Sequence, residues 1–148
     1  MTVNGLPLHP LIVHATVVVL PLLALLGLAY SRPAWRDRLR WPLLAAGVLA
    51  AVLMWLTSAS GDSLKHGRFA TATGVLAERI HDHETLAGRL AVATYALAGV
   101  AVLAALLHGR LPVAARWLAG ALLVVGAVAV GVLVVLTGHA GAEAAWAQ

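Results

Sequence analysis

Four long apolar segments with almost no charge constrain this chain more than any other feature of its sequence. Leu11–Tyr30 and Pro42–Thr57 carry no charged residue, Leu86–Leu107 carries one, and Trp117–Thr137 consists almost entirely of Val, Leu, Ala and Gly. An α-helix needs about 20 apolar residues to cross a bilayer, where every backbone polar group must be satisfied internally. The sequence therefore predicts four membrane-spanning helices.

The composition agrees with an integral membrane protein that has no soluble domain. Of the 148 residues, 61% are hydrophobic and 11% are charged, and the mean hydropathy is +0.92. The absence of cysteine excludes disulfides, thiolate ligands and a protein-held iron–sulfur cluster. The expected fold is all-α: a single four-helix transmembrane domain over residues 1–148, with helices at about 10–30, 42–58, 76–107 and 117–138.

Arginine is concentrated in two short segments between the apolar runs. Ser31–Trp41 contains four Arg and one Asp, and His108–Arg116 contains two Arg and no acid. The other connections hold both basic and acidic residues. The positive-inside rule places the two Arg segments in the cytoplasm, so both termini are expected on the extracytoplasmic side of the membrane. This distribution also argues against nucleic acid as a partner.

The two halves of the chain resemble each other weakly. Histidines precede the first and third apolar runs, a basic segment with Pro and a final Trp follows each, and the second and fourth runs end in TSASGD and TGHAGA. Two helical hairpins related by an axis along the membrane normal would explain this similarity. The alternative is that any four-helix membrane protein shows such features.

Six of the seven histidines fall on the predicted extracytoplasmic side of the bundle. They are His9, His14, His66, His81, His83 and His139, whereas His108 lies on the other side. Imidazole is a common ligand of haem iron, zinc and copper, so a one-sided cluster indicates a cofactor site. We expect His66 and His108 to be solvated loop residues.

Helical geometry separates the candidate ligands. His83 shares a stripe with small residues that mark a helix-facing surface, whereas His81 points roughly 160° away from His83. His14 is more than one turn inside the first helix, where a lipid-facing imidazole would be unfavourable. We therefore expect haem b to be bound by histidines from different helices, His14, His83 and His139 being favoured, and its propionates by Arg79 and Arg89.

Two other functions remain open at this stage. His9, His14, His81, His83 and His139, with acids such as Glu143, would also suit a zinc, copper or iron ion. The other hypothesis is that the chain is an interaction protein without a cofactor. No catalytic motif is present, so we expect electron transfer or binding rather than hydrolase or transferase activity. Candidate partners are the lipid bilayer, a quinone or extracytoplasmic redox protein, and a second copy of the chain.

The opening LPLHPLIVH, the central HDHE and the closing TGHAGAEAAW together resemble a family of small bacterial four-helix membrane proteins known as a domain of unknown function. The resemblance spans nearly the whole chain and carries over to His9, Pro10, Val13 and His14, and to Gly138, His139 and Gly141. The resemblance implies a location in a bacterial inner membrane. Some members are fused to, or encoded beside, Rieske or cytochrome-type redox proteins, which implies redox chemistry by association. The chain departs from the family after His14, where Ala15 and Thr16 replace an aromatic residue and proline.

Overall fold

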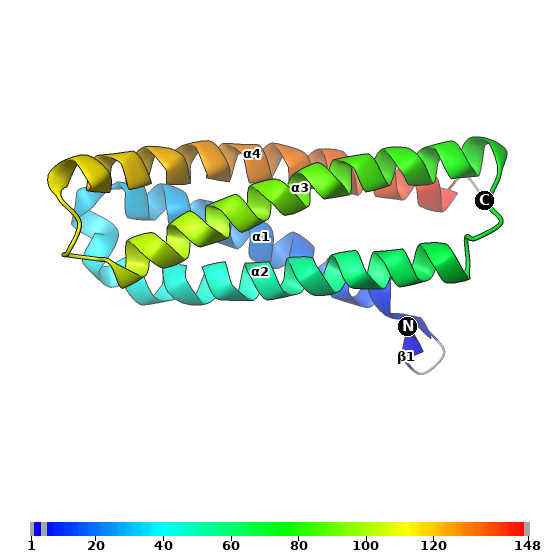
Figure 1. Cartoon of the computed structure of the whole chain (residues 1–148), viewed down its shortest axis with the longest axis horizontal. Coiled ribbons are helices and arrows are strands. Elements are labelled where there is room, and N and C mark those ends of the chain that lie inside the picture. Colours follow the sequence, from blue (N-terminus) through cyan, green and yellow to red (C-terminus); the bar gives the residue numbers. More distant parts are fainter. Residues whose placement is uncertain (1, 4–5, 147–148) are drawn as a thin grey trace.

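The computed structural model describes residues 2–3 and 6–146, which form an elongated bundle of helices lying side by side (Figure 1). In chain order the elements are β1 (Thr2–Val3), β2 (Leu6–Pro7), α1 (Leu8–Ser31), the 3-10 turn η1 (Pro33–Trp35), α2 (Arg36–Gly67), α3 (Gly74–Leu106) and α4 (Val113–Trp146). The four α-helices are long and apolar enough to cross a membrane. The short antiparallel pair β1–β2 was not predicted.

Consecutive helices run in opposite directions, and each packs against two neighbours. α1 and α3 both pack against α2 and α4, and they lie diagonally across the bundle from each other. One end of the bundle, here called the histidine end, carries both chain ends and the α2–α3 connection (Figure 1). The opposite end, here called the arginine end, carries the α1–α2 and α3–α4 turns.

Three of the helices are longer than a membrane requires. α2, α3 and α4 contain 32, 33 and 34 residues. At 1.5 Å per residue each is roughly 50 Å long, whereas the hydrocarbon core is about 30 Å thick. Their polar ends therefore continue as helix beyond the apolar zone.

The predicted helix limits were accordingly too short at the second and fourth helices. α2 begins at Arg36 rather than near residue 42 and ends at Gly67 rather than near 58. The Arg-rich segment predicted as a loop forms its first turns, and the true connection is only Arg32 and η1. The apolar run shows which part of a helix lies in the hydrocarbon core. It does not show how far the helix continues into the polar residues on either side.

Small residues bring the helices into close contact inside the bundle. The fully buried large side chains include Leu20, Leu23, Leu43, Leu97 and Leu123, and they alternate with alanines and glycines. Outward-facing apolar side chains such as Val18, Val92 and Val125 are more than 60% exposed, which suits contact with lipid. The packing therefore depends on close approach at the small positions.

Gly47 is such a position, and it gives a stability prediction. A Cβ atom at Gly47 would lie 3.2 Å from Val102 Cγ2 and 3.3 Å from the Ala98 carbonyl oxygen. We expect Gly47→Leu to destabilise the bundle by about 1–3 kcal/mol through overpacking, measured by unfolding in detergent. The matched control is Gly99→Leu, because a Cβ at Gly99 has no neighbour within 4 Å. Equal destabilisation by both variants would contradict this packing.

Buried positions in the first hairpin recur at a constant offset in the second. The six buried residues of α1 are Thr16, Leu20, Leu23, Ala24, Gly27 and Tyr30, and their counterparts in α3, all buried, are Leu90, Thr94, Leu97, Ala98, Ala101 and Ala104. In the same way, buried Leu43, Gly47 and Ala50 of α2 correspond to buried Leu123, Ala127 and Val130 of α4. The inward faces of the two hairpins thus follow one pattern.

Candidate functional site

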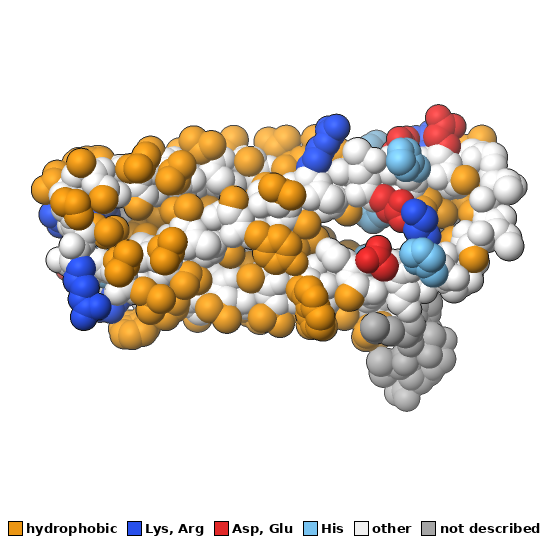
Figure 2. Space-filling view, viewed as in Figure 1, with side chains coloured by type: hydrophobic (Ala, Val, Ile, Leu, Met, Phe, Trp, Pro, Cys, Tyr) orange, Lys and Arg blue, Asp and Glu red, His pale blue; other side chains and the backbone are white. Residues whose placement is uncertain are grey.

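Charged and histidine side chains separate to the two ends of the bundle. Histidine and acidic side chains gather at the histidine end together with some Lys and Arg side chains, further basic side chains mark the arginine end, and apolar side chains cover most of the middle (Figure 2). Six histidines belong to the histidine end, as the sequence predicts. Only two of them, His9 and His83, are partly buried against a neighbouring helix.

His9, in the first turn of α1, is held against α2. Its Nδ1 lies 3.1 Å from the Thr57 carbonyl oxygen and 3.2 Å from Ser60 Oγ. Because a carbonyl oxygen only accepts, Nδ1–H donates to it, and in the neutral ring Nε2 keeps its lone pair. The ring lies against Gly61, where a Cβ would come within 3.2 Å of His9 Cε1. Glycine is thus what lets the ring approach α2.

His83 makes corresponding contacts with a carbonyl and a glycine between α3 and α4. Its Nδ1 lies 3.1 Å from the Thr137 carbonyl oxygen, so Nδ1–H again donates and Nε2 keeps its lone pair. Its ring lies against Gly141, where a Cβ would come within 3.0 Å of His83 Cε1. The prediction that His83 faces a neighbouring helix is confirmed.

The two imidazoles occupy equivalent places in the two hairpins. Thr57 and Gly61 of α2 correspond to Thr137 and Gly141 of α4, at the offset that relates the buried positions of these two helices. His9 and His83 come from α1 and α3, which lie diagonally across the bundle from each other. The structure therefore brings two similarly oriented ligand-type nitrogens to one end of the bundle.

The other predicted ligands lie on the outside of the bundle. His14 is exposed, and its Nδ1 donates to the Pro10 carbonyl oxygen at 2.6 Å. It lies five residues, or roughly 140° of helical turn, from His9 and so faces away from α2. His66 and His81 are also exposed. His139 is 75% exposed, with Nε2 3.5 Å from Glu143 Oε1.

The two arginines expected to bind propionates have different surroundings. Arg79 Nη1 donates to Glu143 Oε2 at 2.6 Å, and both side chains are about 40% exposed. Arg89 is exposed and lines a shallow apolar groove of α3 with Gly88, Ala93 and Ala96. No ion pair joins Arg89 to Asp82 among the described residues. Within residues 2–3 and 6–146, no group of three or more His, Asp or Glu side chains could hold a metal ion.

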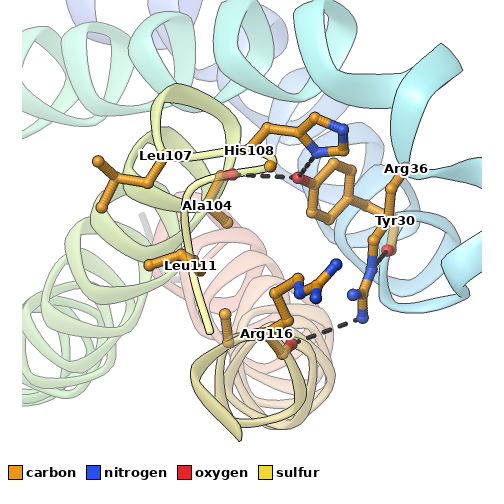
Figure 3. Close-up of a pocket in the computed structure, with 9 residues that line it drawn as sticks. Tyr30, Arg36, Ala104, Leu107, His108, Leu111 and Arg116 are labelled. Carbon is orange, nitrogen blue, oxygen red and sulfur yellow. Dashed lines mark hydrogen bonds between the residues drawn. The ribbon is translucent and has the colours of Figure 1, made fainter. Parts of the chain in front are cut away.

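A hydrogen-bonded chain at the arginine end was missed by the sequence analysis. Tyr30, which is buried, donates from its hydroxyl to the Ala104 carbonyl oxygen at 3.0 Å and lies 2.9 Å from His108 Nδ1 (Figure 3). His108 Nε2 lies 2.7 Å from Asp37 Oδ1. His108 was predicted to be a solvated loop residue, but its side chain is only 20% exposed.

The sequence offered one clue to this contact. Tyr30 and His108 each close an apolar run at the same predicted side of the membrane, so their side chains could have been expected to meet. The sequence does not fix this contact, because only the packing of the helices brings the phenol edge-on to the imidazole.

Four membrane-length helices with two equivalent imidazoles at one end define a small polytopic membrane protein with a candidate ligand site. The chain belongs to the family described as predicted membrane protein (DUF2231), whose model matches residues 5–148. The family resemblance seen in the opening, central and closing motifs is thereby confirmed. No significant match is found among curated proteins or among solved structures.

Proposed function

We propose that the protein binds b-type haem at the histidine end through His9 and His83 and serves in electron transfer. The observation that carries this proposal is the pair of equivalent imidazoles, each held through Nδ1–H by a main-chain carbonyl. Histidines that ligate metals commonly donate their other ring N–H in this way, which fixes the tautomer and makes the ligating nitrogen more basic. Two such ligands suit six-coordinate haem iron.

The residues around the two rings fit this role. Gly61 and Gly141 leave room for the imidazoles against the neighbouring helices. One or two protein ligands are enough to hold haem iron, whereas a closed zinc site needs four, so a set of two imidazoles favours haem over a metal ion. When bound, haem would supply reversible one-electron chemistry at its iron. His9 and His83 would hold it, and Arg79 and Arg89 are the candidate partners of its propionates.

The test of the function is the absorption spectrum of the purified protein, as isolated and during titration with haem b. We expect one haem per chain, a Soret band typical of six-coordinate iron, and sharpened α and β bands on reduction. Failure to take up haem would overturn the proposal. Stoichiometric zinc, copper or iron in a colourless sample would then point to a metal-ion protein, and an empty protein to an interaction protein.

We infer that the histidine end faces the extracytoplasmic side and that the two hairpins are repeats. The Arg asymmetry supports the orientation, and the equivalent buried positions support the repeats. The orientation predicts that a cysteine at Ala34, in η1, is labelled by an impermeant reagent only after the membrane is permeabilised. A cysteine at Ala145, near the end of α4, is expected to react in intact spheroplasts.

The labelling experiment needs no background correction from the protein, since the chain has no cysteine of its own. Both positions are exposed. Labelling of Ala34→Cys alone in intact spheroplasts would reverse the orientation and place the imidazole pair on the cytoplasmic side.

A further inference from the structure

The arginine end has a large excess of positive charge that the protein does not neutralise. It carries Arg32, Arg36, Arg38, Arg40, Arg110 and Arg116. Its one acid is Asp37, whose Oδ1 lies 2.7 Å from His108 Nε2 rather than beside an arginine. A guanidinium group binds carboxylate or phosphate most strongly through paired N–H donors. This end therefore lacks the anions that its arginines could bind.

Two of these arginines are committed to main-chain carbonyls. Arg40 Nε donates to the Ala105 carbonyl oxygen at 2.9 Å. Arg36 donates through Nε to the Tyr30 carbonyl oxygen at 3.3 Å and through Nη2 to that of Ser31 at 3.2 Å. These contacts satisfy carbonyls at the ends of α1 and α3 and fix the two side chains in place.

Arg116 differs from Arg36 and Arg40, because its guanidinium has no hydrogen-bond acceptor or ion-pair partner within the described part of the chain. It lines a pocket of about 20 Å³ together with Tyr30, Arg36 and His108. Figure 3 shows the Arg116 side chain extending towards Tyr30, with Arg36 beside it. The volume is that of about one water-sized group. A phosphate oxygen is such a group, and it would meet two guanidinium groups there.

The surroundings of the pocket are those of a membrane interface. Val113, Trp117 and Leu118, in the first turns of α4, are each about 60% exposed. The Arg36 guanidinium carbon lies 6.0 Å from the centre of the Trp117 ring. Exposed apolar and Trp side chains beside arginines are typical of the level of lipid headgroups, where basic pockets bind anionic lipids. A ligand that bears both a phosphate and acyl chains fits this combination.

We propose that the pocket between Arg36 and Arg116 binds the phosphodiester headgroup of an anionic membrane lipid. This site lies at the opposite end of the bundle from the imidazole pair and does not depend on the haem proposal. Arg116 makes the main contact, and Arg36, held in place by its carbonyls, provides the second. The exposed side chains of α4 contact the acyl chains.

The test is lipid binding to the delipidated full-length protein, measured by native mass spectrometry with phosphatidylglycerol. We expect Arg116→Gln to weaken binding about tenfold, because a charge-assisted contact is lost. The matched control is Arg110→Gln, which removes one arginine charge from the adjoining α3–α4 turn and does not line the pocket. That variant is expected to bind within about twofold of the wild type, since only diffuse attraction changes.

Three results would overturn the proposal. Equal losses in the two variants would mean diffuse attraction rather than a site. Equal binding of phosphatidylcholine would remove the preference for anionic lipid, and displacement of the lipid by millimolar inorganic phosphate would assign the pocket to a free anion. If Arg116→Gln fails to fold, Arg116→Lys tests the same contact. It keeps the charge but loses the paired donors, and a wild-type affinity for it would also contradict the proposal.

Discussion

Replacement of either His9 or His83 by alanine is expected to weaken haem binding by more than about 100-fold while leaving the bundle folded. Each imidazole supplies one of two ligands, so its loss leaves five-coordinate iron with a high-spin spectrum and weaker retention. Mutation of a residue that hydrogen-bonds to a metal ligand typically lowers metal affinity about 10–100-fold. Loss of the ligand itself is expected to lower haem affinity by more than about 100-fold. The measurement is haem titration by absorption, with circular dichroism to verify helical content.

His14→Ala and His139→Ala are the matched controls for this prediction. Both residues lie at the histidine end, and both were favoured as ligands from the sequence, but their side chains are exposed. Their loss is expected to leave the spectrum unchanged. If His14→Ala loses haem as completely as His9→Ala, the ligand is on the outer surface of α1 and the pair proposed here is wrong.

Gly141→Ala is expected to have the second largest effect, through the position of His83. The new Cβ would lie 3.0 Å from His83 Cε1 and 3.1 Å from its Nδ1, so the ring must move. That movement disturbs the 3.1 Å hydrogen bond from Nδ1–H to the Thr137 carbonyl oxygen. We expect haem affinity to fall about 10–100-fold, the usual effect of a change at the partner that orients a ligand.

Gly138→Ala provides the control on the same helix end. A Cβ at Gly138 has no neighbour within 4 Å, and alanine is the better helix former. This variant is expected to bind haem normally and to be more stable by up to about 1 kcal/mol. A loss of haem in both variants would mean that mobility of the α4 end, rather than contact with the His83 ring, controls binding.

The sequence was sufficient to predict the four helices and the grouping of histidines, because both depend on properties of single segments. Apolar runs without charge locate helices in hydrocarbon, and the small-residue stripe below His83 indicated its inward face. The extensions of α2 and α4 were not predictable in this way, since their polar residues have no apolar period to reveal them.

The choice between His9 and His14 depended on information that the sequence does not contain. α1 is apolar on nearly every side, so its pattern does not show which face meets α2. His14 was favoured because it lies deeper in the apolar run. In the structure, a carbonyl and a glycine of α2 contact His9, which is why His9 rather than His14 is proposed as the ligand, and those contacts join residues that are far apart in the sequence. The same limitation hid the contact between Tyr30 and His108.

His9 in the first hairpin and His83 in the second are held in equivalent ways, but their surroundings differ at one hydrogen-bonding atom. His9 Nδ1 contacts Ser60 Oγ as well as a carbonyl, whereas Ala140 stands at the position equivalent to Ser60 and has no hydroxyl. If the chain arose by fusion of two copies of one hairpin, its ancestor was a symmetric dimer with two identical imidazoles. Fusion allowed one copy to change without the other, so a single mutation could make the two ligand nitrogens unequal in basicity. A homodimer cannot tune its ligands separately in this way.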